Sequence, residues 1–585
     1  MTIQDALTNK LISQETLDNI QLWLGDERYK EFLEEINAAI ESGKWLELEN
    51  AFYKRIAIGT GGIRGPIGFG PNSINKRTIG EAAQGLSQFI HDFGEDAVSG
   101  GVVIGYDARK LAKEFAEISA EVFAANGTPV YIFDSLRATP EISFAVRHLK
   151  ATAGVMITAS HNPRTDNGFK FYWSDGAQVV PPHDAKFMQL VTSVTDIARM
   201  PLEEAKQKGL VKVIGAEIDK AYLQKISELS LVDSTSAKVV FSPMHGSGST
   251  NVLPVLKQKG FNVVVVPEQA EPDENFPTAH GDLINPQFPE VMALSVALGE
   301  KEQADVVIVS DPDADRAALA APDKQGRFRL YSGDEAGAMM THFILSQRKL
   351  KGTLPSEGIV LETYVTTTLI SDIAKSFGVR VVDDLLVGFK YIAEIIEKLD
   401  DPNNFIFAAE ESIGYLAGSF CRDKDGAIAG LILAELASFL KDNNQTFDEY
   451  LYSLGNQYGF YENRLHTLDM SGRQGSEQLF QIMTGMRMTP PIELGSLPVL
   501  KVIDRLPEVQ RDPSKYIVGK TGDQVSLILS EDDKSRITVR PSGTEPIIKL
   551  YIQHYSKHQD GLVEEANRLE EDIVKYVKGL IKKSD

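Results

Sequence analysis

The stretch Gly154-Val155-Met156-Ile157-Thr158-Ala159-Ser160-His161-Asn162-Pro163 decides the fold that we expect for this chain. Its first four residues form an apolar run typical of a buried strand, and small and polar residues follow at once. The chain should therefore turn out of a sheet and expose Ser160 at the edge of that sheet. A serine beside His161, with Lys170 a short way downstream, indicates covalent chemistry on an oxygen nucleophile.

Strand-like and helix-like stretches alternate over the middle of the chain. This alternation predicts mixed, mostly parallel α/β sheets covered by helices. Three times, an apolar strand runs into a short polar loop: at Ser160, at residues 311–316 and at residues 410–415. Ligands bind outside the carboxyl ends of strands in open α/β sheets, so the three loops could converge on one cleft. The β-rich runs are 102–105, 129–133, 154–157, 238–241, 262–266, 305–309, 359–361, 379–382 and 404–407, and a helix-like stretch is 113–125.

The two ends of the chain follow other patterns. Near the C-terminus, strands predicted at 537–539 and 548–553 precede a long helix with one apolar stripe, which we expect to pack on its own sheet rather than form an oligomer seam. The stripe consists of Leu562, Ala566, Leu569, Ile573, Tyr576 and Leu580, and candidate buried positions near the N-terminus are Leu7, Leu11, Leu17, Ile20 and Leu24. The predicted parts are a helical lead-in over 1–50, three related α/β domains over 51–205, 206–325 and 326–455, and a smaller α+β domain over 456–585.

Composition and charge limit the classes of function that the chain can have. The chain of 585 residues is too long for one core, and it lacks the run of about 18 apolar residues that a membrane span needs. Its first residues lack the basic start and apolar core of a secretory signal, and Cys421 is the only cysteine, so we expect a cytoplasmic protein without internal disulfides. The net charge of −22 argues against a nucleic-acid partner but permits a small phosphorylated ligand.

The loop Asp311-Pro312-Asp313-Ala314-Asp315-Arg316 indicates a metal site. Its alternate carboxylates can all point at one cation, and hard oxygen ligands suit Mg²⁺ or Ca²⁺. An EF-hand is excluded because Arg316 stands where that motif needs glycine and Pro322 where it needs glutamate. The alternative is a solvated acidic loop, but three aspartates directly after an apolar strand would repel one another strongly without a counter-ion.

Two glycine-containing loops carry arginine. In Arg540-Pro541-Ser542-Gly543-Thr544-Glu545-Pro546, one guanidinium, two hydroxyls and accessible backbone N–H groups suit a phosphate dianion, although an ordinary turn is the alternative. A Walker loop is excluded at residues 514–521, because Ser514 replaces its first glycine. Residues 59–65 are glycine-rich, but Arg64 breaks the dinucleotide fingerprint, so a flexible turn is as well supported as a binding loop.

The loop Glu410-Glu411-Ser412-Ile413-Gly414-Tyr415 permits two interpretations of its chemistry. Its adjacent carboxylates could form a general acid/base pair, or one carboxylate and a hydroxyl could bind sugar hydroxyls. Residue chemistry alone leaves both open. Further candidate anion contacts, each weak by itself, are His245, Lys390 and Lys424.

Taken together and in this order, these loops resemble the α-D-phosphohexomutase superfamily. The resemblance covers residue 58 to the C-terminus and is closest to the phosphoglucomutase/phosphopentomutase branch. It implies three related α/β domains and a smaller α+β domain around a central active-site cleft. It further implies that a phosphosugar is interconverted between its 1-phosphate and 6-phosphate through a bisphosphate.

Residue roles follow from the resemblance. Ser160 is implied as the phosphate carrier, and Asp311, Asp313 and Asp315 as ligands of one Mg²⁺ whose fourth ligand is an oxygen of the Ser160 phosphate. His161, Lys170 and Lys424 are implied near the transferring group. The implied substrate-binding residues are Arg64, Arg316, Lys390, Glu410, Ser412, Arg540, Ser542, Gly543 and Thr544.

The expected activity is that of a Mg²⁺-dependent phosphoglucomutase with glucose 1,6-bisphosphate as intermediate and activator. Related members often have a histidine in the loop that corresponds to residues 410–415, here named the sugar loop. That histidine has no clear counterpart in this chain, so its acid/base role could pass to Lys424 or Lys170. The alternatives are a phosphopentomutase or phosphomannomutase and, from another class, a non-catalytic phosphosugar-binding protein. A serine hydrolase is disfavoured because no Gly-x-Ser-x-Gly elbow surrounds Ser160.

Overall fold

The computed structural model describes residues 1–56, 58–59, 62–180, 183–470, 472–506, 519–542 and 547–581. The chain divides into two compact units. The first unit consists of Met1–Ile218 with Asp273–Ile284, and the second of Asp219–Pro272 with Asn285–Asp585.

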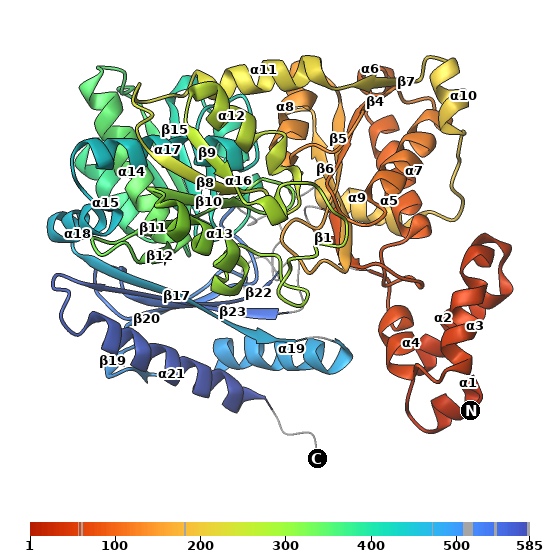
Figure 1. The fold of residues 1–585 in the computed structure, drawn as a ribbon. Helices are drawn as coiled ribbons and strands as arrows, with labels where there is room; N and C mark the ends of the chain where they lie inside the picture. Colours follow the sequence, from red (N-terminus) through yellow and green to blue (C-terminus); the bar gives the residue numbers. More distant parts are fainter. Residues whose placement is uncertain are drawn as a thin grey trace. The chain divides into compact units, whose positions relative to one another are not determined.

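The N-terminal lead-in is helical, as its pattern predicts (Figure 1, red), and its helices enclose a core of their own that contains aromatic side chains. The ring of Trp23 stacks on Tyr29 with 4.4 Å between centroids and meets the edge of Phe52. Leu17 is buried as predicted, but the prediction for Leu11 is wrong: it is 42% exposed, because the first helix ends before it. The elements are α1 (Ile3–Thr8), α2 (Gln14–Gly25), the 3-10 helix η1 (Glu27–Phe32), α3 (Leu33–Glu41) and α4 (Trp45–Phe52).

The first unit is built on a mixed sheet with the order β1-β2-β6-β5-β3-β4-β7 within the described residues. β5, β3, β4 and β7 run parallel, whereas β6 pairs antiparallel with β5 and β2 pairs antiparallel with β6. Asn75 caps the first turn of α5 by accepting from the backbone N–H of Thr78. The strands are β1 (Ile58–Gly59), β2 (Gly62–Pro66), β3 (Val102–Tyr106), β4 (Val130–Phe133), β5 (Ala153–Ile157), β6 (Asp166–Trp173) and β7 (Val211–Ile214). The helices are α5 (Lys76–His91), α6 (Glu95–Gly100), α7 (Ala112–Ala125), α8 (Thr139–Leu149), α9 (His183–Ser193) and α10 (Leu202–Gln207).

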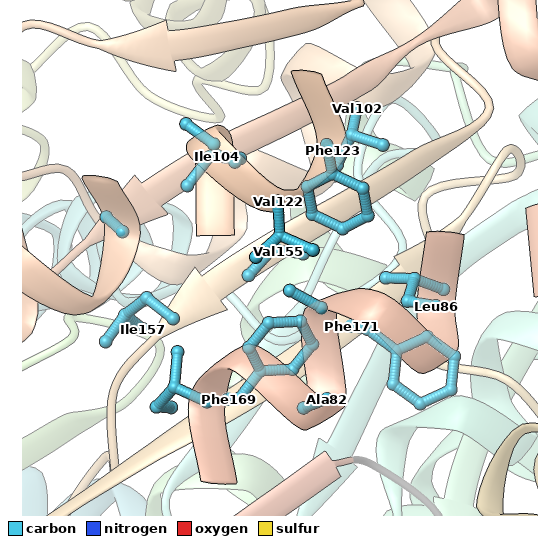
Figure 2. Close-up of a cluster of buried hydrophobic side chains, with 14 of the residues drawn as sticks. Ala82, Leu86, Val102, Ile104, Val122, Phe123, Val155, Ile157, Phe169 and Phe171 are labelled. Atoms are coloured by element: carbon cyan, nitrogen blue, oxygen red, sulfur yellow. The ribbon is translucent and has the colours of Figure 1, made fainter. Parts of the chain in front are cut away.

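The core of this unit lies between one face of the sheet and the helices that cover it. Figure 2 shows side chains of β3, β5 and β6 gathered with those of α5 and α7. Phe169 and Phe171 alternate along β6 and both enter this core, so the residues between and beside them belong to the other face. Gly168 and Lys170 therefore lie on the face opposite the core.

The second unit contains two further α/β sheets. The first has the order β12-β11-β10-β8-β9 and the second β14-β13-β15-β16. Their strands are β8 (Lys238–Ser242), β9 (Asn262–Val265), β10 (Val306–Ser310), β11 (Ala317–Pro322), β12 (Phe328–Tyr331), β13 (Ile359–Thr363), β14 (Arg380–Leu385), β15 (Phe405–Glu410) and β16 (Gly414–Leu416). Their helices are α11 (Ala216–Ser227, which begins in the first unit), α12 (Val252–Lys259), α13 (Pro289–Glu302), α14 (Gly333–Leu350), α15 (Leu369–Ser376), α16 (Phe389–Glu397), α17 (Gly426–Asp442) and α18 (Phe447–Tyr458), with the 3-10 turns η2 (Ser247–Ser249), η3 (Pro267–Gln269) and η4 (Pro402–Asn404).

The three α/β sheets share one local design. A parallel strand leads into a polar loop, and the next strand returns antiparallel beside it: β5 to β6, β10 to β11 and β15 to β16. Each of these loops contains a left-handed residue that is not glycine, namely Ser160 (φ 56°), Ala314 (φ 52°) and Ile413 (φ 55°). The predicted strand-then-loop pattern is therefore confirmed as three hairpin turns of related geometry.

The C-terminal part forms an antiparallel sheet with the order β17-β23-β22-β21-β20, and α19 and α21 pack on it (Figure 1, blue). The expectation that the last helix packs on its own sheet is confirmed, although Val577 is fully buried where the stripe predicts Tyr576. The elements are β17 (Phe460–Asp469), α19 (Gly472–Met488), β18 (Glu493–Leu494), β19 (Leu497–Pro498), β20 (Lys501–Asp504), β21 (Val525–Ile528), β22 (Arg536–Pro541), β23 (Ile547–Ser556) and α21 (Leu562–Leu580).

Two strands extend sheets past the predicted domain boundaries. β7 pairs with β4 beyond residue 205, and β12 pairs with β11 beyond residue 325. The predicted mixed α/β sheets and the α+β C-terminal part are present, whereas the exact division into domains stays a prediction. Among the described residues, no helix combines the length and apolar character that crossing a membrane requires.

Candidate active site

Ser160 lies in the loop between β5 and β6, directly after the carboxyl end of β5 in the first unit. Its side chain is nearly buried, with 1% exposure, and Oγ lies 3.3 Å from His161 Nδ1. The backbone N–H of Ser160 donates to Thr158 Oγ1 over 2.8 Å, and that hydroxyl donates in turn to Asp107 Oδ2 over 2.5 Å. The serine thus lies beside an imidazole nitrogen and has a backbone held by buried side chains. The prediction that Ser160 is exposed is wrong, because its side chain is buried.

Arg64 and Lys170 share a face of the sheet beside this loop. Arg64 pairs with Gly168 across β2 and β6, and Lys170 lies two residues further along β6. Gly168 is required here, because a Cβ would stand 2.5 Å from Ile63 O and 2.7 Å from Thr158 O. The close backbone approach brings β2, β6 and the start of the Ser160 loop together.

Arg109 is a buried residue of this loop region that sequence reasoning missed. Its guanidinium donates to three backbone carbonyls of the loop and to one at the start of β6: Ser160 O (2.5 Å), Asn162 O (2.8 Å), Pro163 O (2.8 Å) and Asp166 O (2.8 Å). The available signal is Asp107-Ala108-Arg109, which follows the apolar strand β3 in the same strand-then-polar-loop pattern as the predicted site loops.

The carboxylates of Asp311, Asp313 and Asp315 form one buried cluster in the β10–β11 turn. One oxygen from each lies within 4.8 Å of the other two, and all three residues are fully buried. Burial, and then the neighbouring Asp313 and Asp315, raise the pKa of Asp311 well above its ordinary value. Three clustered carboxylates are a hard oxygen donor set, so they fit a divalent cation such as Mg²⁺.

Glycines allow other segments to close on the metal loop. A Cβ on Gly246 would stand 2.3 Å from Pro312 O, and one on Gly426 would stand 2.7 Å from Ala314 O. The N–H of Gly426 also donates to Ala314 O over 3.1 Å. His245, before Gly246, is buried, and its Nδ1 lies 3.2 Å from Glu271 O, so its ring contacts the protein backbone.

Two cations border the acidic cluster. Lys424 Nζ lies 2.8 Å from Asp315 Oδ2, and Arg316 Nε lies 3.6 Å from Asp315 Oδ1. Burial alone would lower the pKa of Lys424, but the adjacent Asp315 and Asp423 outweigh it and raise that pKa. Lys424 is therefore a charged ammonium, which can donate a proton but cannot accept one.

The predicted sugar loop adjoins the metal loop. The N–H of Ala317 donates to Ile413 O over 3.2 Å, which ties the two turns together. Glu410 is buried, and its Oε1 accepts from the Gly388 N–H over 2.9 Å. Burial raises the pKa of Glu410 to about 7, against the opposing effect of Lys424. Ser412 is half-buried in the same turn.

Lys390 lies in the first turn of α16, close in sequence to the Gly388 that contacts Glu410. It is mostly buried, and its Nζ lies 4.7 Å from the centre of the Tyr391 ring. The structure thus places Lys390 on the element next to the sugar loop, as a candidate cation there.

Arg540 lies near the end of β22, where its guanidinium contacts a buried tyrosine. Arg540 Nη1 donates to Tyr551 Oη over 3.3 Å. Ser542 is half-buried, and its N–H donates to Ile547 O over 2.9 Å. Gly543 and Thr544, also predicted for this loop, lie outside the described residues.

A cavity of about 260 Å³ lies beside the sugar loop within the second unit. Glu411, Ile413 and Tyr551 line it, together with Asp334 of α14. Burial, and then Glu411, raise the pKa of Asp334 to about 8, although the Thr367 N–H donates to its carboxylate over 2.7 Å. Asp334 and Tyr551 are neighbours of the candidate site that no sequence motif marked.

Known protein families match the chain in three consecutive segments. They are described as phosphoglucomutase/phosphomannomutase α/β/α domain I over residues 55–197, domain II over 220–325 and domain III over 332–458. Such domains, in this order, define a phosphohexomutase-type enzyme. The phosphoglucomutase of Staphylococcus aureus strain N315 is 33% identical over 562 residues, which are 95% of this chain and 98% of that protein. The chain belongs to the phosphoglucomutase/phosphomannomutase family of the α-D-phosphohexomutase superfamily, which confirms the resemblance.

Solved structures support the same fold. A putative phosphomannomutase from Thermus thermophilus superposes with a TM-score of 0.66 at 21% identity, covering 90% of this chain and all of that one (100%). The open form of the Paramecium phosphoprotein pp63/parafusin, a phosphoglucomutase, gives a TM-score of 0.64 at 19% identity, covering 90% of this chain and 95% of that one. At these identities the likeness establishes the fold.

Proposed function

We propose that this chain is a Mg²⁺-dependent phosphoglucomutase that interconverts glucose 1-phosphate and glucose 6-phosphate through glucose 1,6-bisphosphate. The observation that carries the proposal is the buried cluster of Asp311, Asp313 and Asp315. Such a cluster needs a cation to offset its negative charge, and membership of the family indicates that the substrate is a phosphosugar. The near full-length similarity to a phosphoglucomutase favours glucose phosphate over mannose phosphate.

In the first half of the cycle, phosphorylated Ser160 donates its phosphoryl group. The P–O bond to Ser160 Oγ breaks and Oγ takes up a proton, while a P–O bond forms to the oxygen of the sugar's free hydroxyl, whose proton passes to a nearby base. His161 is the proposed base, since its Nδ1 lies beside Ser160 Oγ. Arg64 and Lys170 are proposed to neutralise charge on the transferring group.

In the second half, the bisphosphate reorients and its other phosphoryl group returns to Ser160. The P–O bond to the sugar breaks, a P–O bond to Ser160 Oγ forms, and the serine proton passes to a nearby base. Lys424, as a charged ammonium, can supply the proton that the departing sugar oxygen requires. The cycle ends with the isomeric monophosphate and a phosphorylated serine.

The remaining residues are proposed to hold the sugar phosphate. Glu410 and Ser412 would bind sugar hydroxyls, with Arg316 and Lys390 nearby, and Arg540, Ser542, Gly543 and Thr544 would grip the phosphate that is not being transferred. Asp311, Asp313 and Asp315 would hold Mg²⁺, which supplies charge neutralisation when bound. The action of Ser160 and the aspartates on one phosphate, in one cleft between four domains, stays a prediction from the sequence.

A coupled assay tests the function. Glucose 1-phosphate, Mg²⁺ and a trace of glucose 1,6-bisphosphate are supplied, and glucose 6-phosphate is detected through its dehydrogenase. Ribose 1-phosphate and mannose 1-phosphate are run in parallel with suitable detection. We expect the highest kcat/KM with glucose 1-phosphate. A higher value with ribose 1-phosphate would instead identify a phosphopentomutase, and no turnover of any sugar phosphate would leave only a binding role.

A further inference from the structure

We propose that Arg109 is a positioning residue that fixes the backbone of Ser160 for phosphoryl transfer. The inference rests on the proposed function and adds a residue to it that lies in none of the predicted site motifs. Arg109 is 2% exposed, and its two terminal nitrogens each donate to two backbone carbonyls of the Ser160 loop and the start of β6. One side chain thus binds the backbone at four points between Ser160 and Asp166.

The loop needs such support because Ser160 is left-handed. A residue with a Cβ is less stable at φ 56° than in the right-handed region, so surrounding contacts must hold it there. The carbonyls of Ser160 and Asn162 both turn toward Arg109 Nη2. Without that nitrogen, two buried carbonyls would lose a partner, and an ordinary backbone conformation would be favoured at Ser160.

The N–H side of the same residue is fixed by the same network. Ser160 N–H donates to Thr158 Oγ1, Thr158 donates to Asp107 Oδ2, and Arg109 Nε lies 3.4 Å from that same Asp107 oxygen. The carbonyl of Ser160 therefore binds Arg109 directly, and its N–H is linked to Asp107 through Thr158. Asp107 and Arg109 both follow the end of β3. This strand lies parallel to β5, from which the loop emerges.

A segment from elsewhere in the sequence closes the other side of Arg109 within the first unit. The ring centre of Phe276, which is fully buried, lies 5.9 Å from Arg109 Cζ. Arg164, at the exit of the loop, donates from its backbone N–H to Asp282 O over 3.2 Å and from Nε to Asp282 Oδ1 over 3.0 Å. Arg109 therefore holds the loop through its backbone carbonyls, and residues 273–284 hold it near the start of β6.

Lysine cannot take this place. The rigid fork of arginine spreads its donors over a plane, whereas lysine carries its three donors on one atom and cannot span four carbonyls. We therefore expect Arg109→Lys to keep the positive charge but release part of the loop, which would misplace Ser160 Oγ. Misplacement of a reacting group by about 1 Å can lower a rate by about 100-fold.

The test compares Arg109→Lys and Arg109→Ala with wild type and a matched control, Arg147→Lys. Arg147 also donates to a backbone carbonyl of the first unit, Asp175 O at 2.7 Å, but not within the Ser160 loop. Steady-state turnover of glucose 1-phosphate and the rate at which isolated phosphoenzyme transfers its phosphoryl group are measured. We expect kcat and the transfer rate to fall about 100-fold in Arg109→Lys, with KM within about threefold, and Arg147→Lys to match wild type.

Two further measurements separate positioning from general destabilisation. Added guanidinium should restore part of the transfer rate in Arg109→Ala, and Thr158→Val should lower kcat at unchanged KM while keeping a well-folded chain. Unchanged kcat in both Arg109→Lys and Thr158→Val, or a loss confined to KM, would overturn the inference while wild type stays active. Inactive wild type would instead refute the proposed function.

Discussion

The ammonium of Lys424 lies 2.8 Å from Asp315 Oδ2, inside the acidic cluster that is proposed to hold Mg²⁺. Lys424 thus contacts Asp315, one of the proposed metal ligands, and would place a second positive charge beside the bound cation. Two like charges a few ångströms apart repel by several kcal/mol even at an effective dielectric of about 20. The same ammonium is proposed as a proton donor, so its removal should separate metal affinity from turnover.

We expect Lys424→Gln to bind Mg²⁺ more tightly, by about tenfold, and to turn over much more slowly. Binding is measured by titration calorimetry at pH 8 and turnover by the coupled assay. Lys441→Gln is the matched control, since Lys441 Nζ forms a similar pair with Asp305 at 2.7 Å on the surface. Weaker Mg²⁺ binding in Lys424→Gln would contradict the arrangement.

Ser160→Ala should lower the mutase rate by orders of magnitude because it removes the covalent carrier. Intact-mass measurement should show one phosphoryl group on wild type incubated with glucose 1,6-bisphosphate and none on the variant. An active Ser160→Ala variant, or wild type that never carries phosphate, would rule out the serine as carrier.

Asp313→Asn should raise the Mg²⁺ concentration needed for half-maximal activity by at least about tenfold. The change removes one of three negative charges from the cluster but keeps the side-chain size. Asp400→Asn, an exposed position, serves as the control. An unchanged Mg²⁺ requirement in Asp313→Asn would place the metal elsewhere.

Tyr551→Phe should raise KM for glucose 1-phosphate by up to about tenfold with little change in kcat. The phenol oxygen accepts from Arg540 Nη1, and a hydrogen bond to a charged group contributes about 1.5–3 kcal/mol. The control is Tyr555→Phe on the same strand, whose ring packs against Tyr461 with 4.9 Å between centroids. Equal KM values in the two variants would show that Tyr551 does not orient Arg540.

The stability of wild type should fall as pH rises from about 4 to 8, in part because of Asp334. Burial raises its folded pKa from 3.8 to about 8, so the carboxyl of the unfolded chain ionises first, which favours unfolding. The contribution is complete below pH 3.8 and is lost as pH passes through 8, with an upper size of about 6 kcal/mol. In chemical denaturation across this range, Asp334→Asn should give a flatter pH profile than wild type, whereas Asp400→Asn should follow wild type.

Much of the fold could be predicted because local pattern and tertiary structure agree. Apolar runs such as 154–157 and 306–309 lie in strands, and the polar residues after them form turns where those strands end. The error at Leu11 arose because helical periodicity continues past the point at which α1 ends.

The supporting residues could not be predicted because their partners depend on which strands become neighbours. Arg109 acts on a loop more than fifty residues away in sequence, as its hydrogen bonds to Ser160 and Asp166 show. Tyr551 and Asp334 likewise become site neighbours only when strands and helices from distant parts of the sequence meet. The chemistry-bearing loops have local signatures that indicate their ligands, whereas a local pattern such as Asp107-Ala108-Arg109 does not identify the loop that Arg109 contacts.

The hydrogen bonds from Ala317 N to Ile413 O and from Gly426 N to Ala314 O join the metal turn to the sugar turn and to the start of α17. A change of sugar preference is therefore constrained: substitutions that reshape the backbone at Ile413 would disturb cation geometry as well. New specificities should arise through side chains such as Ser412, whose replacement leaves these backbone links intact. In amide hydrogen exchange, the two turns should open together as one cooperative unit.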